Sequence, residues 1–183
     1  MAAEDALMRR VDSLIGSGYV GREKAVEVED AFPEARARVL GWLRLSSEAG
    51  DWRRFERQAG VAVHLHPEGL AAILAPVLAS RAPGLNSEDL VDMLGELRAP
   101  EGVEPISSLV RERKDMDGPF YALCIKGVQA LAGIGTPEAL RFLEGIARSA
   151  AGEWPDPLRW HAAEELGIED ELGFDEDAMV GGA

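Results

Sequence analysis

The stretch that decides the fold lies in the last third of the chain and reads Gln129-Ala130-Leu131-Ala132-Gly133-Ile134-Gly135-Thr136-Pro137-Glu138-Ala139-Leu140. It begins as an Ala- and Leu-rich run, a composition with high helix propensity. After a Gly-containing turn, Thr136 suits the N-cap of a helix, and Pro137 suits its first position because the missing N–H would have no intrahelical partner there. Glu138 faces the positive end of the helix dipole. The stretch therefore predicts a helix, a short turn and the start of a second helix.

The tripeptide Pro-Glu followed by Ala or Gly recurs along the chain. It starts at Pro33, Pro67, Pro100 and Pro137, with spacings of 34, 33 and 37 residues. Residue frequencies taken independently would give roughly 0.3 such triplets by chance. Each triplet predicts a helix start, so their spacing predicts a repeated pair of helices.

Apolar residues follow the triplets at matching positions. The positions six, nine and ten residues after each proline lie on one helical face, because steps of three and four residues bring side chains together on a helix. Pro76 is the exception, and we expect it to kink or end its helix near residues 72–75. The positions hold Val39, Trp42 and Leu43; Ile73, Pro76 and Val77; Ile106, Leu109 and Val110; and Leu143, Ile146 and Ala147.

Partner helices align upstream of the last two triplets, at residues 87–98 and 119–134. A third copy follows at residues 157–168, where the spacing shortens to 32 residues and a short acidic ending replaces the second helix. An atypical last copy is expected, because a terminal repeat must present a polar outer face.

These features, and the quoted stretch above all, resemble a HEAT-like helical repeat of the short bacterial type over about residues 87–168. The resemblance implies an all-α fold, a right-handed α-solenoid of stacked antiparallel helix pairs with a concave face. It also implies a protein that binds other proteins, and it implies no catalytic residues. The alternative is a non-repeating helical bundle.

We predict three parts along the chain. Residues 1–60 form a less regular N-terminal third whose helices need not be true repeats. Residues 61–175 hold the HEAT-like repeats, and residues 176–183 form a flexible acidic tail. The helices expected in the N-terminal third span residues 3–16, 22–31, 33–48 and 51–59.

The formal net charge of -14 is unevenly spread, with -1 over residues 1–66 and -13 over residues 67–183. This negative charge repels nucleic acid and attracts a basic partner, although acidity also serves solubility. No apolar run is long enough to span a membrane. A single cysteine and the absence of a basic-then-apolar leader at residues 1–10 lead us to expect a cytoplasmic protein.

Two histidine groups have spacings that suit metal binding or acid–base chemistry. The pair His64 and His66 lies in the segment 61–66, which we interpret as a surface linker or a helix cap, and no third ligand is placed by spacing. His161 with Glu164 and Glu165 would share a helix face, but the second histidine of a helix zinc site is missing. We therefore predict a solvated helix pair there, and no metal or cofactor.

Two further features lead to structural rather than chemical predictions. Gly133 and Gly135 lack the third glycine and the preceding strand of a dinucleotide-binding turn. Cys124 falls inside an apolar helical segment, so we predict that it is buried and inert.

The basic stretch Trp52–Arg57 alternates aromatic and arginine residues, which suits nucleic acid binding. Some HEAT-like proteins are DNA glycosylases, so an enzyme of that kind is an alternative. We favour an amphipathic helix with Trp52 and Phe55 packed inward.

The function we predict is a protein-binding module with a basic protein partner, in an adaptor or an immunity- or antitoxin-type role. An enzyme of the glycosylase-like or lyase-like kind and a structural subunit of a larger complex are the alternatives. The unburied faces of the segments at 87–98 and 119–134 would bind the partner through Asp89, Asp92, Glu96, Lys126 and Gln129.

Overall fold

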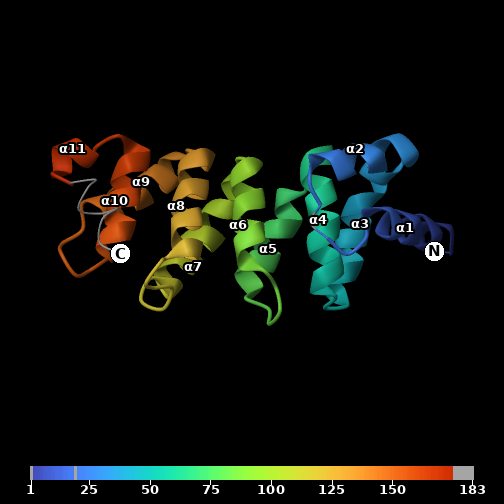
Figure 1. The fold of residues 1–183 in the computed structure, drawn as a ribbon, viewed down its shortest axis with the longest axis horizontal. Helices are drawn as coiled ribbons and strands as arrows, with labels where there is room; N and C mark the ends of the chain where they lie inside the picture. Colours follow the sequence, from blue (N-terminus) through green and yellow to red (C-terminus); the bar gives the residue numbers. More distant parts are fainter. Residues whose placement is uncertain (1, 19, 175–183) are drawn as a thin grey trace. The chain divides into compact units, whose positions relative to one another are not determined.

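The computed structural model describes residues 2–18 and 20–174, and over those residues it contains α-helices, one short 3-10 helix and no strand (Figure 1). The all-α fold class is therefore confirmed. The predicted tail at 176–183 lies outside the described residues. The helices are α1 (Ala2–Ile15), α2 (Arg22–Ala31), α3 (Ala35–Glu48), α4 (Trp52–Leu65), α5 (Ala71–Ser80), α6 (Ser87–Glu96), η1 (Pro100–Gly102), α7 (Val103–Arg113), α8 (Ala122–Ile134), α9 (Pro137–Ala147), α10 (Asp156–Leu166) and α11 (Glu169–Leu172).

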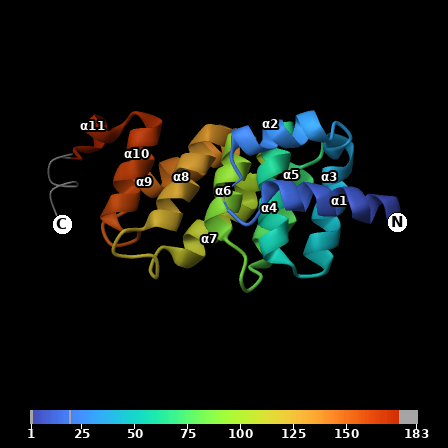
Figure 2. The ribbon, with the colours of Figure 1, turned by 45° about the vertical axis from the view of Figure 1, so that its right-hand side comes forward.

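The chain divides into two compact units, residues 1–93 and residues 94–183, which we call unit 1 and unit 2. In unit 1, each of the helices α1 to α4 packs against the other three, and α5 packs against α3. Figures 1 and 2 show α1 and α2 running across α3 and α4. The centre of this cluster holds the fully buried side chains of Trp42, Leu43 and Phe55.

In unit 2, packing alternates along the chain. Helix α7 packs against α9, α8 packs against α10, and each of these helices also contacts its neighbour in sequence. The two alternate contacts place α7 and α9 in one layer and α8 and α10 in the other, while α11 packs on α10. Two stacked helix pairs have this contact pattern; a continuous right-handed solenoid over residues 61–175 stays a prediction.

Glycine allows helices of unit 2 to approach one another closely. A Cβ atom added to Gly127 of α8 would lie 2.4 Å from Val110 Cγ2 of α7, and one added to Gly95 would lie 2.9 Å from the Cα of Ala130. Both distances are far below van der Waals contact, so a larger residue at either position would push the helices apart.

The four triplets lead into helices in different ways. Pro137 is the first residue of α9, and the Thr136 hydroxyl accepts a hydrogen bond from the Ala139 N–H at 3.2 Å, as the sequence predicts. Pro100 instead opens the 3-10 turn before α7. Pro33 and Pro67 lie in turns that precede α3 and α5, so these two prolines do not start their helices.

The predicted buried face is confirmed at all four copies. Of the twelve positions predicted six, nine and ten residues after each proline, only Pro76 is exposed and all the others are buried. Of the two effects expected of Pro76, an end of the helix near residue 75 is wrong, because α5 continues through Pro76 to Ser80, and a kink stays a prediction. Proline removes one N–H, and the apolar side of α5 remains anchored by buried Ile73, Leu74 and Leu78.

The predicted end of the fourth helix is also wrong. Helix α4 runs to Leu65 rather than to residue 59, so His64 lies on the helix and the segment 61–66 is not a linker. The reason is burial: all residues from 58 to 63 are buried, and continuing the helix pairs their backbone groups. The predicted boundary at residue 60 thus falls inside α4, and the start of the repeats at residue 61 stays a prediction.

Candidate functional site

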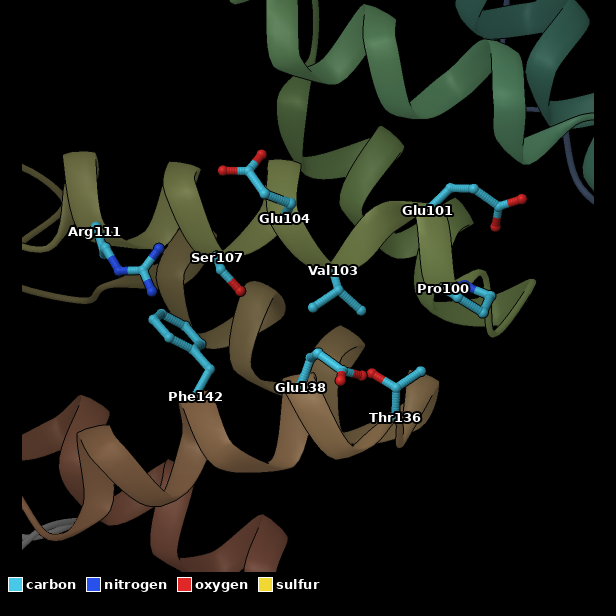
Figure 3. Close-up of a pocket in the computed structure, with 9 residues that line it drawn as sticks. All are labelled: Pro100, Glu101, Val103, Glu104, Ser107, Arg111, Thr136, Glu138 and Phe142. Carbon is cyan, nitrogen blue, oxygen red and sulfur yellow. The ribbon is translucent and has the colours of Figure 1, made fainter.

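Two adjoining hollows lie along the surface between α7 and α9, with volumes of about 500 and 470 Å³. We call them together the α7–α9 groove; they share Arg111, Glu138 and Phe142. Their volumes are in the range of ligand pockets in proteins. The first hollow is lined by Pro100, Glu101, Val103, Glu104, Ser107, Arg111, Thr136, Glu138 and Phe142, and the second adds Arg141, Gly145, Ile146 and Trp154 (Figure 3).

Helical spacing places these side chains in rows. Val103, Ser107 and Arg111 are four residues apart, so they form one stripe along α7. Glu138 and Phe142 form the matching stripe on α9. Figure 3 shows Val103 and Ser107 directed from α7 toward α9, and Phe142 of α9 facing Arg111 of α7.

One end of the groove is closed by alternating aromatic and cationic side chains, which we call the aromatic–cation row. The Arg111 guanidinium lies 4.5 Å from the centre of the Phe142 ring, and Lys114 Nζ lies 5.1 Å from the centre of the Trp154 ring. Phe142 and Trp154 meet edge to face with ring centres 6.0 Å apart. Lys114 also donates a hydrogen bond to the Glu153 carbonyl, so the row ties α7 to α9 and to the loop after it.

The other end of the groove is acidic. Glu138 pairs with Arg141 at 2.9 Å, and hydrogen bonds from its own backbone N–H, from Arg141 and from Thr136 lower the pKa of its carboxyl. Glu101 and Glu104 are exposed and make no ion pair with any residue that the structure describes. Figure 3 shows their carboxylates directed outward from the rim formed by η1 and α7.

Ser107 lies in the wall of the groove and its side-chain oxygen has no partner. The residue is 5 % exposed, and its Oγ accepts or donates no hydrogen bond among the described residues. A buried hydroxyl left unpaired costs about 1–3 kcal/mol. In Figure 3 its Oγ points into the space between α7 and α9.

None of the five residues predicted to bind a partner lines the α7–α9 groove. Asp89, Asp92 and Glu96 are exposed on α6, while on α8 Gln129 is exposed and Lys126 is half-buried. The first two belong to unit 1 and the other three to unit 2. Their role in partner binding stays a prediction.

The groove residues were missed because the predicted partner-binding residues lie on α6 and α8, whereas the groove lies between α7 and α9. One signal could have found them. Phe142 stands five residues after Pro137, outside the buried positions six, nine and ten, so it is a large aromatic side chain on a face that the repeat leaves open. Ser107 and Arg111 share that open face of α7.

The basic stretch Trp52–Arg57 holds the N-terminal helix. Arg54 Nε donates to Asp12 Oδ2 at 2.7 Å, and Arg57 Nη1 donates to the Gly16 carbonyl at 2.7 Å. Phe55 is fully buried and meets Trp52 edge to face. Because Arg54 and Arg57 are engaged with α1 and the loop after it, this stretch favours the amphipathic-helix interpretation over a phosphate-binding surface.

The histidine groups do not gather further ligands. Within the described part of the chain no cluster of three His, Cys, Asp or Glu side chains is arranged to hold a metal ion. His161 Nδ1 lies 3.2 Å from Glu164 Oε2 on the surface of α10. Burial, followed by the charge of Glu164, raises the pKa of Glu165, and His161 opposes this increase.

Cys124 is buried in α8, as predicted. Burial raises the pKa of its thiol to about 12, and the neighbouring Asp117 adds to the shift. The thiol is therefore protonated at neutral pH, and since the thiolate is the reactive form, its environment suppresses nucleophilic chemistry.

No described helix is both long enough and apolar enough to span a bilayer. The chain matches no family model, no curated protein and no solved structure. The HEAT-like resemblance therefore stays a prediction from the sequence.

Proposed function

We propose that this chain is a HEAT-like protein-binding module that takes a segment of a basic protein in the α7–α9 groove. The observation that carries the proposal is the make-up of the groove: apolar surface from Val103 and Phe142 lies beside the carboxylates of Glu101 and Glu104, which make no ion pair with residues that the structure describes. Apolar grooves with charged rims are a recurrent means of peptide recognition.

The charge of unit 2 supports a basic partner. Unit 2 contains 18 acidic and 8 basic residues, giving -10, whereas unit 1 contains 15 and 11, giving -4. A field of this sign attracts basic proteins and speeds their association, and it repels the phosphates of nucleic acids. The attraction is screened by salt, so binding to the partner weakens as ionic strength rises.

Exposed apolar side chains in unit 2 support a protein rather than a small ion as the partner. Met116 and Phe120, in the loop that follows α7, are 66 % and 80 % exposed. Aromatic and methionine side chains are enriched in protein interfaces. Phe142, half-buried beside Arg111, offers an anchor of the same kind within the groove.

The packing of unit 2 supports the HEAT-like assignment. The buried positions recur after each triplet, and α7–α9 and α8–α10 pack as successive helix pairs would. In a solenoid of such pairs each layer presents a continuous surface, and binding through one layer leaves the core of the pair undisturbed.

Selection from a random displayed peptide library tests the proposal. We expect the enriched peptides to combine Lys or Arg with an apolar residue. The double variant Glu101→Lys, Glu104→Lys should weaken their binding about tenfold, because two exposed rim charges together contribute about 1–2 kcal/mol.

The matched control is Glu23→Lys with Glu29→Lys, which changes the net charge equally at two exposed positions on α2 of unit 1. Equal loss of binding in the two double variants would mean that only net charge matters and would contradict the groove. Enrichment of acidic peptides would contradict the basic partner.

A further inference from the structure

We infer that the first hollow of the α7–α9 groove, between Ser107 and Glu138, is a pocket for one arginine side chain of the partner. The inference rests on the proposed protein-binding function and adds to it the residue that the groove selects. It starts from the unpaired Ser107 hydroxyl, which the packing of unit 2 does not explain.

A serine at position 107 costs the fold stability. Its Oγ is buried without a hydrogen-bond partner among the described residues, and alanine has the higher helix propensity in the middle of α7. The neighbouring Ser108 differs, because its hydroxyl donates to Glu112 Oε1 at 2.9 Å. A ligand group that bonds Ser107 Oγ accounts for a hydroxyl that the fold itself does not use.

The walls of the pocket suit a long aliphatic stem. Pro100 and Val103 line it from η1 and α7, and Phe142 lines it from α9. A cavity of about 500 Å³ has room for one long side chain and part of its backbone. Arginine and lysine both carry such a stem and bury it along apolar surface while the charged head reaches polar groups.

The polar groups of the pocket select a cation. Glu138 of α9 lies across the cleft from Val103 and Ser107, and its hydrogen bonds keep it ionised (Figure 3). Glu101 and Glu104 add two further negative charges at the rim, on exposed side chains that are free to change rotamer on binding. Arg111 lies against the Phe142 ring at the opposite end of the cleft. Because its positive charge repels a second cation, an incoming cation lies nearer to Val103 than to Arg111.

Arginine fits these groups better than lysine. A guanidinium presents donors on several sides of one plane, so it can donate to Ser107 Oγ from one side and to the Glu138 carboxylate from another. An ammonium is a compact and strongly hydrated charge, and it loses more hydration on entering a cleft with apolar walls. Arg141, the present partner of Glu138, is exposed and can share the carboxylate, which has two oxygens.

The test is an NMR titration of the full chain with the N-acetyl methylamides of arginine, lysine and citrulline, the last being the neutral isostere of arginine. The arginine derivative should shift the amide resonances of residues 103–107 and 136–142 in a saturable way. We expect binding of the lysine derivative to be several-fold weaker and that of the citrulline derivative to be at least tenfold weaker.

Two pairs of variants locate the contact. Ser107→Ala should weaken binding of the arginine derivative about tenfold, because it removes the acceptor for a charged donor, whereas Ser108→Ala should leave binding unchanged. Glu138→Gln should weaken it similarly, and Glu144→Gln, on the same helix but outside the groove, should not. Thermal melts establish that each variant is folded, and Ser107→Ala is expected to melt higher than the parent.

The inference is overturned if the arginine and citrulline derivatives, or the arginine and lysine derivatives, bind equally. It is also overturned if Ser107→Ala binds as the parent does, or if the arginine derivative causes no shift up to its solubility limit. Basic peptides that bind the groove with no requirement for arginine would refute this pocket and leave the proposed function standing. Binding of the arginine derivative at Ser107, without binding of any peptide, would support this pocket and refute the proposed function.

Discussion

Polar side chains in the two units have different partners. In unit 1 the basic stretch of α4 bonds to α1, and the buried Ser46 hydroxyl donates to Gln58 Oε1 at 2.9 Å. In unit 2 the polar groups of the α7–α9 groove include a buried serine without a partner and two rim carboxylates without ion pairs among the described residues. Unit 1 uses its polar groups to hold its own helices, while unit 2 leaves several of them available.

A buried polar group without a hydrogen-bond partner does not by itself distinguish the two units. Trp42 Nε1 in unit 1 also lacks a hydrogen-bond partner within the described part of the chain, but Trp42 is fully buried among α1 to α4 and lines neither hollow. Ser107 is orphaned at the wall of a groove. The comparison teaches that the location of an unpaired group, rather than its existence, points to a ligand.

The largest expected effect comes from truncating one phenylalanine in each unit. Phe55→Ala should lower the free energy of unfolding by about 3–5 kcal/mol, because Phe55 is fully buried. Phe142→Ala should cost only about 1–2 kcal/mol, since Phe142 is half-buried and its ring contacts are with the Arg111 guanidinium and the Trp154 ring. Urea unfolding of both variants measures the difference; equal losses would contradict an open groove in unit 2.

Two serine-to-alanine substitutions should change the free energy of unfolding in opposite directions. Ser46→Ala should destabilise the protein by about 1–3 kcal/mol, because it leaves the buried Gln58 amide oxygen without its donor. Ser107→Ala should stabilise it by about 1 kcal/mol, because it removes an unpaired buried hydroxyl. Chemical denaturation compared with the parent chain gives both signs, and a loss of stability in Ser107→Ala would show that this hydroxyl already has a partner.

Glycine-to-alanine substitutions at two positions of unit 2 should show a smaller difference in stability. Gly127→Ala should cost about 1–2 kcal/mol, because its Cβ would overlap the stiff Val110 side chain and outweigh the gain in helix propensity. Gly145→Ala has nothing within 4 Å of the new Cβ and should stabilise α9 by about 0.5–1 kcal/mol. Thermal melts decide the signs. If Gly127→Ala leaves the stability unchanged, α7 and α8 separate easily.

The effect of Cys124 is absent at neutral pH and appears only in alkali. Its folded pKa of about 12 lies above the ordinary thiol pKa of about 9, so the folded state holds the proton more tightly. The associated stability is complete below about pH 9 and is lost as pH rises toward 12. The difference in unfolding free energy between the parent and Cys124→Ala should therefore shrink across that range. A constant difference from neutral pH to pH 12 would contradict the raised pKa.

Prediction from the sequence succeeded where one physical rule dominates. The position of Thr136 and the buried residues after each triplet follow from helix capping and helical periodicity, and the structure confirms both. It failed at Pro76 and at the end of α4, where burial of the surrounding residues outweighs the local signals to stop. Local propensity does not include that energy, which tertiary packing supplies.

The groove could not be predicted from the sequence, for a different reason. Arg111 and Phe142 are 31 positions apart in the chain, and their contact depends on how α7 packs against α9. Helical periodicity indicates which side of each helix is open, but it does not say which open sides face each other. The five predicted partner-binding residues lie on α6 and α8 and line neither hollow of this groove, and their own role stays a prediction.

The bond from Arg54 to Asp12 has a consequence for the protein during its synthesis. The two residues are 42 positions apart, so α1 is made well before the side chain that holds it. At roughly 5–20 residues per second, this interval lasts roughly 2–8 seconds. During that time Met8, Val11 and Ile15, which are buried in the finished unit, have no α4 to cover them. The buried face of α1 is therefore available to a ribosome-associated chaperone until α4 is made.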